Sequence, residues 1–594
     1  MVGLPYDFLV NPLGAVRSTF EKALASGSDP TSLDGKDWGV IELFRNFLFD
    51  QGGLSQAPVL NRATIRRVQP NTLVRFRGMI QDMLGNEFYV GAYKDDSVWR
   101  TNKFMDVSQF PMDTSSDKKV WERRLLYCVQ VPGQSSWTEI SSETVINGSM
   151  DWEFPLREKR RREVDESSDF MDILDSNDEV QSSSSMKKRK EDGHPSHASQ
   201  SRGTLTVATD SSMCKVPNVD GDYTPCLVKI YDSPESDLKL NDVFEFIGVL
   251  TFDPELQTDK EDHNEFSIEF HEDALVQLPP NKVPRLHCLI HRKLAANDFL
   301  KSSPMMELKP HWVKSIREDL LKHLTAVLGN DDLAAHFMLL HLLSRVHART
   351  ETVAVGKLSL NFTCFSKESV SVFGNHLGDA IKNLIPFTHF ISLTVDYLNT
   401  ASLAPQKDYD TNRLVAGVLQ LAEGSHLLID ETKLEAGTLN SVGVENARLL
   451  KILMEFQKVE YDFKFYKMDM AADVQLLILS DGKSNILPAD LVVPFQPSTV
   501  DSLDSMPTEA LEAWRWYLAT VKLLPHSIES EMQKVVENDL VAARQADRNL
   551  GSQDFSRWLT MARLVSASFG ETCLSLEHWQ MVKELERMRK ERLK

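Results

Sequence analysis

The sequence predicts a multidomain α+β protein, in which a β-rich part is followed by an α/β part and a helical end. Three observations predict this architecture. Hydrophobic residues recur with a period of two in residues 59–155 and again in 213–283, which favours β-strands. Short apolar runs alternate with helix-period segments in residues 284–500, which favours a largely parallel sheet between two layers of helices. Residues 501–594 have a helical pattern almost throughout, and residues 1–58 form a shorter helical segment.

The N-terminal segment is expected to contain helices that pack into a core. Asn11 and Pro12 mark a helix start, because asparagine caps a helix and proline fits its first turn. Apolar residues at positions 40, 41, 44, 47 and 48 lie on one face of a second helix. Such a stripe is more typical of core packing than of a groove for a partner.

The two β-rich segments are expected to form a small barrel of the oligonucleotide/oligosaccharide-binding (OB) type. Residues 72–80 alternate as a strand does, Gly85-Asn86 is expected to be a turn, and residues 240–250 again lead from a turn into a strand. Glycines interrupt both strands, as they do at the sharp bends of a small barrel. The pattern leaves open whether the two segments build one barrel or two.

Four side chains in the first β-rich segment are candidates for binding single-stranded nucleic acid, because OB-type barrels stack bases on aromatic rings beside a basic groove. They are Arg75, Arg77, Phe88 and Tyr89. The formal net charge of the chain is −20, which repels phosphate, so core aromatics and solvated arginines are the favoured interpretation. The sequence thus argues against direct nucleic-acid binding. A single-strand-binding protein stays as an alternative function, which salt-dependent binding to oligonucleotides would reveal.

Residues 156–212 are expected to be a disordered linker. Mixed blocks of charge and a near-absence of aromatic residues leave too little apolar surface to offset the entropy of ordering. Two basic clusters on this tether predict nuclear localisation signals, the nuclear import machinery as a partner and the nucleus as the compartment; a solubilising charge run is the alternative. The clusters are Lys159, Arg160, Arg161 and Arg162, and Lys187, Lys188, Arg189 and Lys190.

Metal, disulfide and membrane sites are not expected. The 6 cysteines have no CxxC spacing, which fits reduced thiols better than a disulfide frame or a zinc knuckle. His336, His341 and His347 do not match the HExxH spacing, and His287-Cys288 lacks a second pair of ligands. No apolar run approaches the roughly 20 residues that cross a bilayer, so no membrane partner is expected.

The most informative motif of the α/β region is an acidic pair behind an apolar run. A helix-period run at residues 413–422 is followed by a break at Gly424-Ser425 and then by residues 426–429, which are apolar enough for a buried parallel strand. This strand ends on Asp430 and Glu431. Helix, turn, apolar strand and acidic pair form the layout of a Walker B element, in which one carboxylate holds Mg²⁺ and the other polarises the attacking water.

The α/β region lacks the loop that would hold the phosphates of a nucleotide. A P-loop has the pattern GxxxxGK[ST] between a strand and a helix, and its backbone N–H groups surround the phosphates. The strand expected at residues 358–363 is followed by a segment without glycine. Gly482-Lys483-Ser484 has the right ending, but Leu477 occupies the place of the first glycine. We therefore expect an ATPase skeleton with a degenerate Walker B pair, Asp430 and Glu431, without catalysis and without a cofactor.

The ordered set of motifs resembles a known family. Residues 413–424 and 426–431 are similar to the Walker B region of the mini-chromosome maintenance helicase subunits, which place OB-type barrels before an AAA+ domain. This chain lacks the P-loop and the cysteine pairs of those subunits. It instead resembles the mini-chromosome maintenance complex-binding protein family, to which the opening at residues 3–16 and the strand at 358–361 are also similar.

The resemblance implies that residues 284–500 form a degenerate AAA+-like domain and that the protein is a non-catalytic partner of the replicative helicase. It implies binding of soluble helicase subunits, with a role in their assembly or stability. It also implies unloading of the complex from chromatin and an effect on sister-chromatid cohesion. An active AAA+ ATPase with an unconventional nucleotide site is the second alternative, which stoichiometric nucleotide binding would expose.

Overall fold

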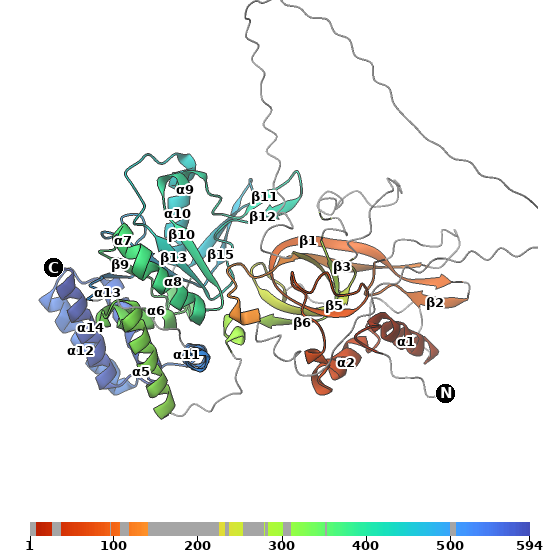
Figure 1. The fold of residues 1–594 in the computed structure, drawn as a ribbon, viewed down its shortest axis with the longest axis horizontal. Helices are drawn as coiled ribbons and strands as arrows, with labels where there is room; N and C mark the ends of the chain where they lie inside the picture. The colour runs from red at the N-terminus through yellow and green to blue at the C-terminus, as the bar shows by residue number, and fades with distance from the viewer. Residues whose placement is uncertain are drawn as a thin grey trace, which may run out of the picture. The chain divides into compact units, whose positions relative to one another are not determined.

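The computed structural model has a mixed α/β fold that contains several sheets (Figure 1). All described residues belong to one compact unit of the chain. No helix among them is long and apolar enough to cross a membrane. The structure describes residues 7–26, 37–95, 97–106, 118–139, 225–231, 237–252, 278, 283–300, 310–350, 353–498 and 507–594.

The N-terminal helices follow the sequence prediction. Helix α1 (Pro12–Ala25) is capped by Asn11, whose side chain accepts a hydrogen bond from the backbone N–H of Gly14. Helix α2 (Val40–Arg45) continues into the π-turn η2 (Asn46–Asp50). The stripe at positions 40, 44 and 48 is buried in a cluster with residues of the first sheet, so this helix packs into a core as expected.

The first sheet joins both predicted β-rich segments. Its order is β2-β1-β3-β4-β6-β5, and β5 also pairs with β1, so the pairing returns to the strand near which it started. β4 and β6 are parallel, whereas the other pairs are antiparallel. Strand β6 begins at Arg285, which lies beyond residue 284, the predicted start of the α/β region. The strands are β1 (Leu73–Asp95), β2 (Val98–Thr101), β3 (Lys118–Val129), β4 (Cys226–Ile230), β5 (Val243–Leu250) and β6 (Arg285–Leu294).

Strand β1 pairs with three neighbours because it bends. Its first residues pair with β5, its longer remainder pairs with β3, and register shifts interrupt the β1–β3 ladder at three places. One shift lies between Met83 and Gly85, where the glycine has a φ of +88°. The predicted turn at Gly85-Asn86 is therefore wrong, because a bulge accommodates the left-handed glycine while the strand continues.

Gly248 of β5, one of the glycines expected at a sharp bend, allows a close approach to β6. A Cβ atom at this position would lie 2.1 Å from the carbonyl oxygen of His287 on β6, so no other side chain fits without moving the backbone. The register between β5 and β6 shifts at the same place. The glycine thus marks a bend at which β5 and β6 come into close contact.

The second large sheet is parallel throughout, as the alternation of strands and helices predicted. Its order is β10-β13-β16-β9-β17. Each neighbouring pair runs in the same direction. The strands are β9 (Leu360–Thr363), β10 (Thr388–Ser392), β13 (Ser425–Asp430), β16 (Val474–Leu479) and β17 (Leu491–Pro494).

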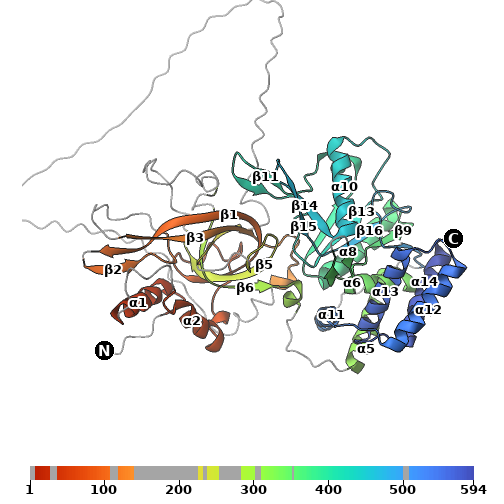
Figure 2. The same cartoon turned by 180° about the vertical axis from the view of Figure 1, so that it is seen from behind.

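Helices cover both faces of the parallel sheet, so the predicted three layers are present (Figures 1 and 2). Leu428 and Leu477 lie in one apolar cluster, with residues of α5, α6, α8 and the C-terminal helices. Their neighbours Leu427 and Ile478 lie in a second cluster, with residues of α9 and α10. Consecutive residues of a strand point to opposite faces, which explains this division. The helices are α5 (Pro310–Val327), α6 (Asp332–Leu343), α8 (Asn375–Leu384), α9 (Val395–Thr400) and α10 (Ser441–Phe456).

The C-terminal helices dock on the face of the parallel sheet that α5, α6 and α8 also cover. Arg592 donates to a carboxylate oxygen of Asp331 over 2.7 Å, and Arg589 donates to the carbonyl of Val492 in β17. Trp514 and Trp579 are buried in the shared cluster. These helices are α11 (Thr508–Val521), α12 (Ser530–Ala546), α13 (Ser552–Ser568) and α14 (Leu576–Arg592), and the short elements elsewhere are η3 (Gly53–Ser55), η5 (Ala296–Phe299), β7 (Ala348–Arg349), β8 (Ala354–Val355), α7 (Lys367–Ser369) and η6 (Val370–Gly374).

The predicted helix at residues 413–422 is wrong. This segment begins with the short strand β12 (Arg413–Val415), and its remaining residues are not helical. β12 belongs to a four-stranded sheet, which we call the small sheet, with the order β12-β11-β14-β15. The other three strands are β11 (Gln406–Asp408), β14 (Lys458–Asp462) and β15 (Lys467–Ala471).

Hydrogen bonds to distant segments replace those of the expected helix. The backbone N–H of Leu414 donates to Asp82 over 2.9 Å, and that of Leu419 donates to the carbonyl of Leu403 over 3.0 Å. Gly417 packs so closely that a Cβ atom would lie 2.3 Å from the same carbonyl oxygen of Leu403. Leu414, Leu419 and Ala422 are buried whereas Val415 and Val418 are exposed, so the helical spacing does not mark one buried face, and tertiary contacts override the local preference.

Candidate functional site

The carboxyl ends of the parallel strands bring the predicted acidic pair near the loop after β9. Ligands of open parallel sheets bind at this edge. β13 ends at Asp430, β16 ends at Leu479, and β9 ends at Thr363. β16 lies between the other two strands. The candidate site therefore consists of the acidic pair, the turn after β16 and the loop after β9.

Asp430 is completely buried and already accepts hydrogen bonds from its own turn. One carboxylate oxygen accepts from the backbone N–H of Thr432 at 3.0 Å and from its hydroxyl at 2.6 Å. The other oxygen lies 3.6 Å from the ammonium group of Lys433. These contacts fix the end of β13 and place a cation beside the carboxylate.

Glu431 is half-buried beside Asp430, and burial raises the pKa of its carboxyl group above the ordinary value. Its backbone N–H donates to the carbonyl of Leu479 over 2.8 Å, which holds the residue against β16. Its Oε2 atom is buried without a hydrogen-bond partner in the described residues. A carboxyl group with a raised pKa can act as a general base. Such a base would serve ATP hydrolysis only if the neighbouring loop could bind the phosphates of the nucleotide.

Two backbone donors of the loop after β9 are occupied by the protein itself. The N–H of Cys364 donates to the carbonyl of Asp481 over 2.8 Å, and the N–H of Phe365 donates to the carbonyl of Ser480 over 3.0 Å. A P-loop needs such N–H groups free and directed at the ligand. Here the turn after β16 occupies the N–H groups of Cys364 and Phe365.

Aromatic packing fixes this loop in place. Phe365 is completely buried, and its ring stacks on Phe495 with a centroid distance of 4.4 Å. Phe362 and Phe373 also contact Phe495. Hydrogen bonds and aromatic packing thus hold the loop in one conformation.

The two arginines proposed for nucleic-acid binding form ion pairs with Glu245, a carboxylate with 1% of its side chain exposed. Arg75 and Arg77 approach one oxygen of Glu245 at 2.6 and 3.0 Å. Arg292 approaches the other oxygen at 2.7 Å. Both guanidinium groups are thus engaged with a carboxylate of the protein and are not free donors for a phosphate.

The two aromatic candidates of the same segment lie in different environments. Phe88 is 62% exposed, whereas Tyr89 packs edge-on against Trp121 and Tyr231. The guanidinium group of Arg123 lies 4.7 Å from the centre of the Tyr89 ring. Only Phe88 is thus available to stack on a base, and the preference for core aromatics holds for Tyr89.

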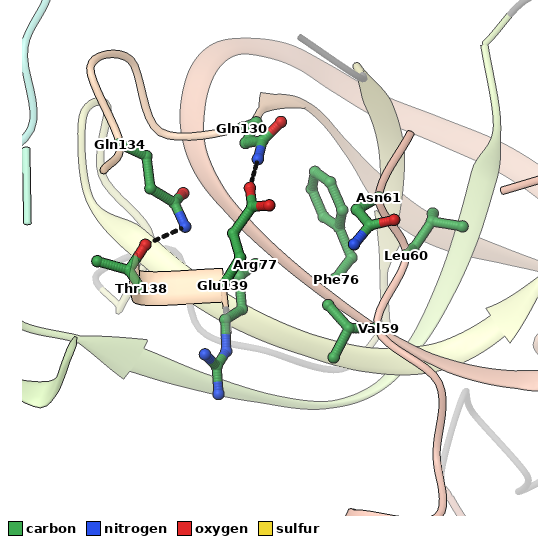
Figure 3. Close-up of a pocket in the computed structure, with 9 residues that line it drawn as sticks. All are labelled: Val59, Leu60, Asn61, Phe76, Arg77, Gln130, Gln134, Thr138 and Glu139. Carbon is green, nitrogen blue, oxygen red and sulfur yellow. Dashed lines mark hydrogen bonds between the residues drawn. The ribbon is translucent and has the colours of Figure 1, made fainter. Parts of the chain in front are cut away.

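A pocket at the first sheet is lined by side chains that bond one another (Figure 3). The amide of Gln130 donates to Glu139, and the amide of Gln134 donates to the hydroxyl of Thr138 over 2.9 Å. Arg77 also lines the pocket, but it pairs with Glu245. The side-chain amides of Gln130 and Gln134 are thus engaged with the protein itself.

The family model described as mini-chromosome maintenance replisome factor matches residues 44–593 of this chain. The chain belongs to this family. The resemblance inferred from the sequence is thereby confirmed.

Relatives of this family member are similar over their whole length. A protein named mini-chromosome maintenance complex-binding protein from Arabidopsis thaliana is 60% identical over 100% of both chains. Proteins of the same name from Salmo salar and Homo sapiens are 34% and 32% identical over 99% of this chain, and the match covers 97% and 98% of them.

Several predicted features of this chain lie outside the described residues. They include both basic clusters, at residues 159–162 and 187–190, and Cys214. The other five cysteines are free thiols. Among the described residues, no group of three His, Cys, Asp or Glu side chains is arranged to hold a metal ion.

Two histidines that the sequence analysis did not pair meet inside the family member's α/β region. The Nε2 atoms of His341 and His426 lie 3.0 Å apart, and both rings are completely buried. The Nδ1 atom of His341 donates to the carbonyl of Leu358, so its Nε2 accepts from His426. Burial lowers the pKa of His341 to about 4 and that of His426 well below its ordinary value.

The buried pair of His341 and His426 predicts that the free energy of unfolding decreases at acid pH. Because the folded-state pKa is lower than the unfolded value of about 6.5, the unfolded chain binds the proton first as the pH falls. The contribution of His341 is thus complete at neutral pH and is lost between about pH 6.5 and pH 4. Urea unfolding at several pH values should give a shallower pH dependence for His341→Gln than for His336→Gln on the same helix. Equal slopes would contradict the prediction.

Proposed function

We propose that this chain is a non-catalytic binding protein of the mini-chromosome maintenance helicase and acts in DNA replication. The observation that carries the proposal is the closed loop after β9, whose N–H groups at Cys364 and Phe365 are occupied. A domain that cannot hold phosphates does not hydrolyse ATP. The name shared by the relatives supports helicase binding as the remaining role of the fold.

The strand orders of the two large sheets support the proposal of an OB-type barrel followed by an AAA+-like domain. An OB-type barrel is supported by the first sheet, in which β1, β3, β4, β6 and β5 follow one another, β5 pairs again with β1, and β4 runs parallel to β6. The parallel sheet, with an acidic pair after β13, supports a degenerate AAA+-like domain in which Asp430 and Glu431 are the remnant of a Walker B element. The domain boundaries predicted from the sequence belong to the same proposal, except that β6 extends the first sheet to Leu294.

The proposed mechanism is binding without nucleotide turnover. AAA+ domains assemble into rings through their side faces, and those faces do not require a hydrolysed nucleotide. A chain that takes the place of one subunit stabilises soluble helicase subunits or opens the ring, but it cannot power the ring. Unloading of the complex from chromatin, and through it an effect on sister-chromatid cohesion, follow from this mechanism.

The nucleus is the proposed compartment, and the nuclear import machinery is the proposed partner of the two basic clusters. Replicated DNA is nuclear, so a helicase-binding role requires import. Replacing the lysines and arginines at residues 159–162 and 187–190 by alanine should move a fluorescent fusion to the cytoplasm; an unchanged nuclear signal would contradict this assignment.

Complex formation tests the proposed function. The pure chain is mixed with soluble helicase subunits, and the mixture is separated by size-exclusion chromatography with light scattering. We expect a discrete complex whose mass equals a whole-number sum of this chain and helicase subunits. Separate elution of all components at micromolar concentration would contradict the proposal.

A further inference from the structure

The small sheet carries a group of exposed aromatic side chains that none of the functions above uses. Phe465 is 80% exposed, Tyr466 is 57% exposed, and Tyr409 is 45% exposed. They lie in the connection between β14 and β15 and just after β11, and in both views these strands lie together at the edge of the α/β region (Figures 1 and 2). We call Tyr409, Phe463, Phe465 and Tyr466 the aromatic tip.

The side chains of the aromatic tip hold one another in place. Phe463 stacks on Tyr466 at a centroid distance of 4.9 Å, and Tyr409 meets Phe465 edge-on at 5.3 Å. The hydroxyl of Tyr409 donates to the carbonyl of Phe463 over 2.9 Å. Aromatic rings fixed in this way lose little conformational entropy when a partner covers them.

The backbone of the turn is also fixed. The N–H of Phe463 donates to the carbonyl of Tyr466 over 3.0 Å, and the N–H of Lys464 donates to the side chain of Asp462 over 2.7 Å. Lys464 has a φ of +62°, which is unfavourable for a residue with a side chain. Neither the strained backbone nor the exposed aromatic ring stabilises the fold. Because backbone strain is concentrated at functional sites, this turn points to a role in binding.

The charges of the small sheet do not suit a nucleic acid. Residues 406–415 and 458–471 contain five basic and five acidic side chains. Four of the five basic side chains already have partners: Lys407 with a backbone carbonyl, Arg413 with Asp82, Lys458 with Asp469, and Lys467 with Glu445 and Glu460. A phosphate backbone requires a run of free cations. Paired charges around tyrosine and phenylalanine are instead typical of a protein interface.

We infer that the aromatic tip enters an apolar cleft on a helicase subunit and is a main anchor of the complex. The inference rests on the proposed function, and it names the surface that the sequence left open. Interface hot spots are rigid aromatic side chains that become fully covered on binding, and Phe465 and Tyr466 have the exposure and the fixed geometry for this role. The sequence signal is a run of aromatic residues at a turn between two alternating segments.

The test compares two variants in binding to soluble helicase subunits, with affinity measured by fluorescence titration of the labelled chain. The first variant is Phe465→Ala/Tyr466→Ala, and the control is Phe88→Ala, which removes a side chain of similar exposure from the first sheet. Both variants should keep the circular dichroism spectrum and Tm of the unchanged chain, because the side chains are exposed. We expect the double substitution to weaken binding at least tenfold and the control to change it less than twofold.

Each other outcome contradicts a different statement. Equal affinities of all three chains would overturn the role of the aromatic tip and leave the proposed function intact. No binding by the unchanged chain would overturn the proposed function, and the inference with it. Binding of the unchanged chain to a labelled single-stranded oligonucleotide, abolished by the double substitution, would assign the aromatic tip to nucleic acid instead of protein.

Discussion

Glu245→Ala should lower the free energy of unfolding by about 3–5 kcal/mol, the cost of leaving a buried charge without its partner. Burial alone would raise the pKa of the Glu245 carboxyl group, but Arg75 and Arg77 hold it down at about 2. The side chain of Arg75 is only 9% exposed, so its charge has no access to water once the carboxylate is removed. Urea unfolding followed by circular dichroism measures the effect.

The control uses the third arginine of the same cluster. Arg292 also approaches Glu245, at 2.7 Å, but 55% of its side chain is exposed. Water therefore screens the pair, and Arg292→Ala should cost about 0–1 kcal/mol. A similar loss for both substitutions would show that burial does not decide the strength of these pairs.

Phe365→Ala should be similarly destabilising, by about 3–5 kcal/mol, because it leaves a cavity among aromatic rings. Phe365 is completely buried and stacks on Phe495 at 4.4 Å. The substitution should still not create nucleotide binding, because the backbone N–H groups of residues 364 and 365 stay bonded to the turn after β16. Urea unfolding and a nucleotide titration on the same sample measure the two effects.

Phe390→Ala is the matched control in the same sheet. Phe390 belongs to the edge strand β10 and is 56% exposed, so its removal leaves no cavity and should change stability by less than about 0.5 kcal/mol. If Phe365→Ala cost no more than Phe390→Ala, the loop after β9 would not be held by packing.

The parallel sheet could be predicted from the sequence because its central strands β13 and β16 are buried on both faces. Residues 426–429 and 474–479 are short, nearly continuous apolar runs, and β13 and β16 occupy these positions. The acidic pair at the end of β13 was also placed correctly at the carboxyl edge. Local apolar content and turn residues suffice for such elements.

The segment before β13 could not be predicted from its period. Residues 413–422 show apolar residues at helical spacing, but Asp82, more than 300 positions earlier, accepts a hydrogen bond from Leu414. Helix propensity is a weak local preference, and contacts with distant segments override it. No signal within the ten residues themselves reveals this partner.

The pairing of the first sheet depends on contacts that the pattern of single strands does not contain. Periodicity predicted strands near residues 73–80 and 240–250, but not that Val74 lies opposite Gly248. The same holds for the closed loop: the missing glycine after β9 predicted that phosphate would not bind, whereas the carbonyls of Ser480 and Asp481 became evident only in the fold.

A calorimetric titration of the pure chain with Mg²⁺-ATP tests the central proposal most directly. The proposal is that this binding protein has an ATPase-like fold in which the phosphate site is closed. The occupied N–H groups of Cys364 and Phe365 predict no saturable binding up to millimolar nucleotide. Stoichiometric binding with a micromolar Kd would contradict the account, and its loss in Asp430→Asn or Glu431→Gln would identify the acidic pair as a working nucleotide site.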